Sequence, residues 1–88
     1  MREELEKLKN EVLVTISHAS TEKEISDIRV RYLGRKGSIT QLLKGLGALS
    51  ESERREVGRE ANQLKEITEA SIEEAFSRVR ERERREVL

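Results

Sequence analysis

The chain has 88 residues, of which 34% are apolar and 41% charged, with one Tyr, one Phe and no Trp; this favours a single small domain of long helices with a thin core. The absence of cysteine excludes disulfides and thiolate metal sites, and the single histidine, His18, argues against a histidine metal site. No apolar run approaches the roughly 20 residues of a membrane span and no signal peptide is visible, so we expect a cytoplasmic protein without membrane contact.

The first predicted helix runs over about residues 3–17. Its apolar residues recur every three or four positions and therefore share one face of the helix. They are Leu5, Leu8, Val12 and Ile16. The segment 17–20 breaks the pattern. The sequence leaves open whether the first helix folds back here into a three-helix bundle or only kinks and continues.

A second helix is predicted over about residues 21–33. Thr21 and Glu24 form a capping box, in which the hydroxyl accepts a backbone N–H and the carboxylate reaches back. The apolar face consists of Ile25, Ile28 and Tyr32. Gly34 follows the helix and can take the left-handed conformation that often ends one.

Two further helices are predicted over about 38–45 and 50–86. Ser38 with Gln41 and Ser50 with Glu53 have the spacing of capping boxes. The third helix directs Ile39, Leu42, Leu43 and Leu46 inward, and Gly45 and Gly47 end it. The stripe of the fourth consists of Val57, Ala61, Leu64, Thr68, Ile72, Ala75 and Val79.

The fourth helix, about 52 Å long at 1.5 Å per residue, has a narrow apolar stripe between highly charged faces. This pattern is typical of a coiled-coil arm. We therefore predict an all-α fold, an antiparallel helical hairpin with a short helix near the turn and a long C-terminal helix. The earlier helices supply the antiparallel partner, so the turn between them should lie at or near the tip of a rod.

Charge is distributed unevenly although the formal net charge is zero. Between Ile28 and Ser50 the chain has five basic residues and no acidic one, whereas the remainder has 13 basic and 18 acidic residues. The five are Arg29, Arg31, Arg35, Lys36 and Lys44. Pairing between residues four apart explains the mixed charges of the flanks but not this window. A surplus of positive charge indicates an anionic partner, most often a nucleic acid.

The window contains two glycines three residues apart, Gly34 and Gly37, with Arg35 and Lys36 between them. Such a loop lets the backbone approach an anion closely, although two glycines can also simply separate two helices. KH domains clamp nucleotides with a similar loop, but the chain has no strand pattern. Tyr32 either stacks on a base or packs in the core. Arg29 and Arg31 either face outward or pair with acids of the same chain.

Constellations that would indicate an enzyme are absent from the sequence. It has no Ser/His/Asp combination, no phosphate-binding GxxxxGK[ST] loop and no paired Cys/His set. The many acidic residues fall on exposed faces of predicted helices. We therefore assign no catalytic residue, metal site or cofactor to this chain.

Two segments resemble a known family. Residues 29–44 read RVRYLGRKGSITQLLK, and residues 53–65 read ERREVGREANQLK. They are similar to the patterns R-x-x-Y-L-G-K-K-G-x-L-T-x-L-L-K and E-R-x-x-x-G-x-x-x-N-x-x-K of the N-terminal domain of the bacterial phenylalanyl-tRNA synthetase alpha subunit. Arg35 replaces a lysine with conserved charge, and Ile39 replaces a leucine.

The resemblance implies that residues 1–88 are one N-terminal arm domain, and that the class II catalytic domain of the parent is absent from this chain. The parent family joins phenylalanine to tRNA(Phe) with ATP and Mg²⁺, as a tetramer of two alpha and two beta subunits. The arm would grip tRNA phosphates through Arg31, Arg35, Lys36 and Lys44, with Arg29 as a further candidate.

A second hypothesis is a structural coiled coil that associates with itself or docks on another protein. The long stripe and the uncapped C-terminal end favour it. The sequence leaves open the oligomeric state, the region of tRNA that is contacted, and whether the natural chain ends at Leu88.

Overall fold

The computed structural model describes residues 2–86, and these form an all-α fold. The elements are α1 (Arg2–His18), α2 (Glu22–Leu33), α3 (Ser38–Gly45), the short 3-10 helix η1 (Leu46–Ala48) and α4 (Glu51–Glu86). These bounds differ from the expected ones by at most one residue. The molecule is a rod of 57 × 19 × 16 Å, so the predicted helical arm is confirmed. None of the described helices is long and apolar enough to span a bilayer.

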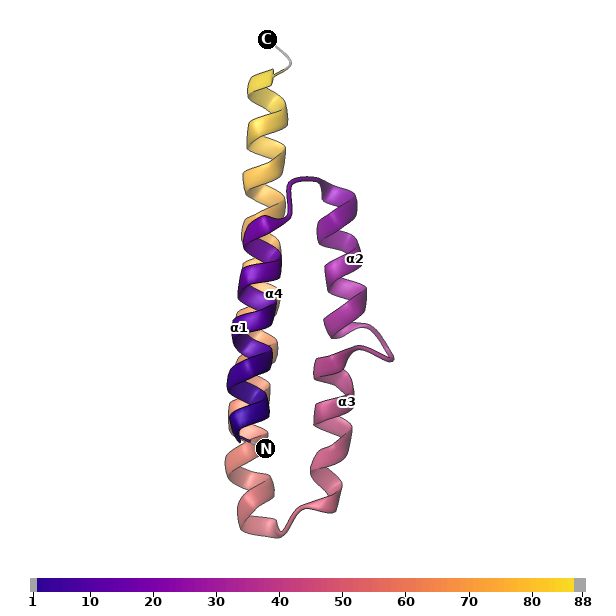
Figure 1. Cartoon of the computed structure of the whole chain (residues 1–88), viewed down its shortest axis with the longest axis vertical. Coiled ribbons are helices and arrows are strands. Elements are labelled where there is room, and N and C mark those ends of the chain that lie inside the picture. The colour runs from indigo at the N-terminus through magenta and orange to yellow at the C-terminus, as the bar shows by residue number, and fades with distance from the viewer. Residues whose placement is uncertain (1, 87–88) are drawn as a thin grey trace.

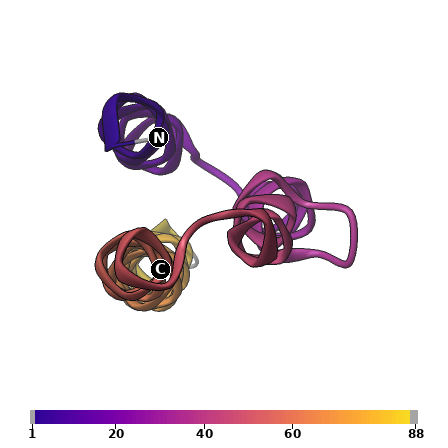
Figure 2. The same ribbon diagram turned by 90° about the horizontal axis from the view of Figure 1, so that it is seen from below.

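The chain folds back at the break after α1. Figure 1 shows α1 running along α4, and α2 and α3 returning one after the other beside them. Arg80 pairs with Glu22 and Glu73 pairs with Arg29, so α2 is antiparallel to α4 as predicted. In contrast, α1 is parallel to α4, because the chain reverses twice between them. The end-on view in Figure 2 shows three columns, α1, α4 and the stacked pair α2 and α3.

The basic loop, residues Gly34–Gly37, does not lie at an end of the rod. In Figure 1 it lies part way along, and in Figure 2 it projects sideways, away from both α1 and α4. After the loop α3 continues in the direction of α2, and the chain reverses only after η1. The prediction that the basic turn forms the tip is therefore wrong. The tip is formed by η1 and the start of α4.

The core follows the predicted stripes. Every residue predicted for the α4 stripe is buried, and Thr68, the polar one, donates its hydroxyl hydrogen to the carbonyl of Leu64 at 2.7 Å. The other helices and the α1–α2 turn contribute Leu5, Val12, Ile16, Ala19, Ile25, Ile28, Tyr32 and Ile39 to the same cluster. Four predicted core residues, Leu8, Leu42, Leu43 and Leu46, are only partly buried. The core is thus a single layer of side chains along α4.

Two of the three predicted caps are present. The N–H of Glu24 donates to Thr21 Oγ1 at 3.1 Å, and its carboxylate accepts from the N–H of Ser20. The hydroxyl of Ser50 accepts from the N–H of Glu53 at 3.4 Å. The cap predicted at Ser38 is wrong by one residue. Ser38 is the first residue of α3, and Gly37 is the N-cap, because its carbonyl accepts from the N–H of Gln41 at 2.9 Å.

Arginines of α4 hold the turn between α1 and α2. Arg78 donates to the carbonyls of Ile16 at 3.3 Å and Ala19 at 3.2 Å, and Arg82 donates to the carbonyl of Ser20. Ile16 is in the last turn of α1 and Ala19 and Ser20 follow it, so these carbonyls of the turn receive charged donors from α4. The contacts fix the α1–α2 turn to α4.

The glycines of the basic loop are required by close backbone packing. Gly34 and Gly37 have φ values of −66° and −68°, so the left-handed conformation predicted for Gly34 is wrong. A Cβ at Gly37 would lie 2.6 Å from the carbonyl oxygen of Tyr32, and one at Gly34 would overlap the carbonyl of Val30. Both obstacles are backbone atoms, which cannot move aside without distorting the end of α2.

We expect Gly37→Ala to lower the free energy of unfolding by about 1–3 kcal/mol, because the added methyl group overlaps the backbone of α2. Gly47→Ala is the matched control. A Cβ there meets nothing within 4 Å, so it should be neutral or stabilise by up to about 1 kcal/mol. Urea unfolding followed by circular dichroism measures both, and equal effects of the two substitutions would contradict the prediction.

We expect Arg78→Ala to lower the free energy of unfolding by about 1–3 kcal/mol, because two carbonyls lose a charged donor. Arg59→Ala, an exposed arginine on the same helix, should change it by less than about 0.5 kcal/mol. Amide hydrogen exchange should also quicken around the α1–α2 turn in the first variant. Unchanged exchange there would show that Arg78 does not hold the turn.

Candidate nucleic-acid interface

The five basic residues predicted as phosphate contacts all belong to one column of the bundle, which α2, the basic loop and α3 form (Figure 2). Arg29 and Arg31 are in the second half of α2, Arg35 and Lys36 in the basic loop, and Lys44 in the last turn of α3. All five are exposed. We call this surface the α2–α3 edge. The chain has no acidic residue from Ile28 to Ser50, so any acid that offsets these charges must come from another part of the chain.

The fold of the basic loop directs its two cations outward. The N–H of Gly37 donates to the carbonyl of Gly34 at 2.9 Å, which closes a tight turn with Arg35 and Lys36 at its outer side. The loop stands clear of the bundle in Figure 2. Within the described residues, neither cation forms an ion pair or a hydrogen bond. Both charges are therefore available to an external anion.

The start of α3 adds to the positive potential beside the loop. Its N-cap is Gly37, which has no side chain to accept from the first amides, and the first turn of α3 contains no acidic residue. The first amides of a helix lack intrahelical acceptors and form the positive end of its dipole. Lys44 lies six residues after Ser38, the first residue of α3, which is about 9 Å along the helix. The loop and α3 thus present a short row of positive groups.

Arg29 and Arg31 differ from the loop cations in having partners within the chain. Arg29 pairs with Glu73 of α4 at 3.5 Å, so the alternative of intramolecular pairing is correct for this residue. The pair is weak, because the arginine side chain is 50% exposed and water screens the attraction. The guanidinium of Arg31 lies 5.4 Å from the centre of the Tyr32 ring, within the range of a cation–π contact.

Tyr32 is a core residue and cannot stack on a base. Its side chain is fully buried, and its hydroxyl donates to Glu11 Oε2 at 2.9 Å, which ties the end of α2 to α1. Burial raises the pKa of the Tyr32 phenol above its ordinary value of 10.0, and the Glu11 carboxylate acts in the same direction. The phenol therefore stays neutral and donates this hydrogen bond at physiological pH.

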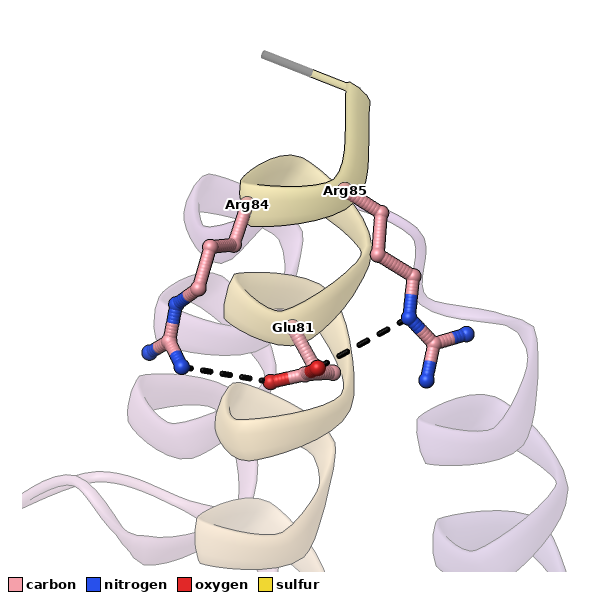
Figure 3. A network of polar contacts seen from close by, with 3 residues as sticks. All are labelled: Glu81, Arg84 and Arg85. Carbon is pink, nitrogen blue, oxygen red and sulfur yellow. Dashed lines mark hydrogen bonds and ion pairs between the residues drawn. The ribbon is translucent and has the colours of Figure 1, made fainter. Parts of the chain in front are cut away.

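Basic residues at the C-terminal end of α4 are engaged, unlike those of the loop. Figure 3 shows Arg84 and Arg85 directed toward Glu81, at 3.4 Å and 3.6 Å. Arg80 pairs with Glu22 at 2.8 Å and lies over the ring of Phe76. This end has as many basic residues as the loop region, but its arginines have partners within the chain, whereas the two cations of the loop have none among the described residues.

The sequence did not predict Glu11 and Glu73 as partners of Tyr32 and Arg29, because both contacts join distant parts of the chain.

The charges of the α2–α3 edge are suited to binding an anion. Among the described residues no group of three His, Cys, Asp or Glu side chains comes close enough to hold a metal ion. What the α2–α3 edge offers is exposed cations on a rigid support. These can neutralise phosphates, whereas the chain presents no exposed aromatic ring there for reading bases.

Comparison with known proteins identifies the family of the chain. Residues 20–88 match the family model described as aminoacyl tRNA synthetase class II, N-terminal domain. A phenylalanine–tRNA ligase alpha subunit of Trichlorobacter lovleyi is 48% identical over 81 residues, 92% of this chain and 24% of that protein. Those of Pelobacter propionicus and Desulforamulus reducens are 48% and 43% identical over all 88 residues, 26% of each protein.

The chain therefore spans about a quarter of the length of these curated relatives. The matched region includes both segments on which the predicted resemblance rests, and the resemblance is confirmed. The chain belongs to the family of N-terminal domains of class II aminoacyl-tRNA synthetases.

Proposed function

We propose that the chain is the tRNA-binding arm of a phenylalanine–tRNA ligase alpha chain, and that it grips phosphates of tRNA(Phe) with the α2–α3 edge. The observation that supports this most strongly is the pair of unpaired cations at the outer side of a projecting loop, on an edge without acids. Arg31, Arg35, Lys36 and Lys44 are the main proposed contacts. Arg29 is a further one and must first leave Glu73.

Recognition by this edge would depend on the shape of the RNA backbone. Guanidinium and ammonium groups contact phosphates, which position a nucleic acid without reporting its sequence. Both aromatic residues of the chain are unsuited to stacking, since Tyr32 is buried and Phe76 packs against the core. If four or five phosphates are neutralised, the logarithm of the binding constant should fall with the logarithm of salt concentration with a slope of about −3 to −4.

The relatives, which are alpha subunits of phenylalanine–tRNA ligase, support a proposal for the wider setting of the arm. We infer a cytoplasmic enzyme of two alpha and two beta subunits, in which other domains bind ATP and Mg²⁺ and carry out aminoacylation. The arm would then support the reaction by holding the tRNA while its acceptor end reaches the catalytic domain. Its own residues would take no part in the chemistry.

The structural alternative, self-association along an apolar face, has little support. The exposed large apolar residues are Val14 (55%), Val30 (67%) and Ile67 (38%). Each lies on a different helix, so no single helix of the described chain presents a continuous stripe of exposed large apolar residues to a second copy. Sedimentation at several concentrations should show a monomer, and a dimer that ignores RNA would favour the alternative.

Removing the two charges of the basic loop should weaken RNA binding and make the binding constant less sensitive to salt concentration. We expect Arg35→Gln/Lys36→Gln to lower the affinity for tRNA(Phe) and to reduce the steepness of the salt slope by about 1.4–1.8, because two phosphate contacts are lost. Fluorescence anisotropy with labelled tRNA(Phe), at several salt concentrations, measures both quantities.

Arg84→Gln/Arg85→Gln is the matched control. It removes the same charge from two adjacent residues that are already bound to Glu81 (Figure 3), and it should leave the slope unchanged. The proposed contact is wrong if the loop variant keeps the wild-type slope, or if the control loses as much as the loop variant.

A further inference from the structure

One row of residues on α4 faces α2 and α3. Two ion pairs with α2 define the row, Arg80 with Glu22 and Glu73 with Arg29. At its other end is Gly58, where an added Cβ would lie 3.6 Å from the Leu46 side chain of η1. Positions 58, 65, 69, 73 and 80 are seven, four, four and seven residues apart, so they share one face of the helix. Ile67, Ser71 and Glu74 line grooves with α1 instead. The row therefore lies on the side of α4 away from α1.

Lys65 occupies the middle of this row, level with the basic loop. It is seven residues, about 10 Å of helix, from Gly58, which lies beside Leu46. Seven residues before Leu46 is Ile39, in the first turn of α3, so Lys65 lies at the level of that turn. Counting from the other end of the row gives the same level. Glu73 pairs with Arg29 in the second half of α2, and Lys65 is eight residues, about 12 Å of helix, from Glu73, so it lies beyond the end of α2.

The charge of the row changes sign next to Lys65. Its ammonium group is exposed, and among the described residues it has neither an ion pair nor a hydrogen bond. One turn further along the row is Glu69, and two turns further is Glu73, which holds Arg29. The half of the row toward the α1–α2 turn is thus acidic or paired. The half toward η1 offers a cation beside the loop and α3.

We propose that Lys65 is a further phosphate contact, so that RNA lies across both α3 and α4. This inference rests on the proposed function and extends its site from one edge to two elements. The RNA touches the loop and α3 on one side and α4 on the other. The acids at positions 69 and 73 limit the bound region toward the α1–α2 turn, which leaves Arg29 at its margin.

The test compares Lys65→Gln with wild type, using anisotropy with labelled tRNA(Phe) across a salt series. We expect the affinity to fall and the slope to become less steep by about 0.7–0.9, the loss of one phosphate contact. Lys65→Arg keeps the charge and should restore the wild-type slope. Lys7→Gln is the matched control, since it removes an exposed lysine on α1, which does not contact α3, and should leave the slope unchanged.

Circular dichroism serves as the folding control, and each variant should keep the wild-type helix content and melting temperature. A wild-type slope in Lys65→Gln, with binding by the wild-type chain intact, overturns the role of Lys65 and leaves the loop assignment standing. Equal losses in Lys65→Gln and Lys7→Gln also overturn it, because net charge alone then explains the effect. If the wild-type chain does not bind tRNA at low salt, the proposed function fails, and the role of Lys65 fails with it.

Discussion

The structure depends on covering one apolar stripe of α4. This 36-residue helix has too narrow a stripe and too many charges to be stable alone, so α1 and the stacked pair α2 and α3 must lie along it. Tyr32 and Ile39 are both fully buried against this layer although the basic loop separates them. Because α2 and α3 both continue along α4, the residues between them have no place in the layer and are forced outward. The projection of the loop is a consequence of the core.

Electrostatics then divides the surface of the rod. Toward the α1–α2 turn, opposite charges meet across helices, as in the pairs of Arg80 with Glu22 and Arg29 with Glu73. These exposed pairs contribute little stability each, but they leave little unbalanced charge in that region. Toward η1 the loop and α3 have cations without acids. A polyanion would therefore find one favourable region on a chain whose formal net charge is zero.

Local patterns predicted the helices, the stripes and two caps, because periodicity and capping depend on residues within one or two turns. They could not predict the place of the loop. A pair of glycines permits either a reversal or a sideways bulge, and the burial of Ile39 against α4 decided between them. Local pattern also failed at Gly34. The sequence predicted a left-handed conformation there, but the structure needs glycine because its backbone packs closely against the carbonyl of Val30. For the site, exposure of the five basic residues could be predicted, but the partners of Arg29 and Tyr32 come from distant helices. The roles of the five basic residues in RNA binding remain predictions.

The central claim is that RNA binds where the unpaired cations gather. The most direct measurement is a titration of the ¹⁵N-labelled chain with tRNA(Phe) at low salt, followed by amide chemical shifts. The account predicts that the largest changes fall between Arg31 and Lys44 and around Lys65 on α4. Changes concentrated instead on α1, or at the Arg84–Arg85 end of α4, would contradict it.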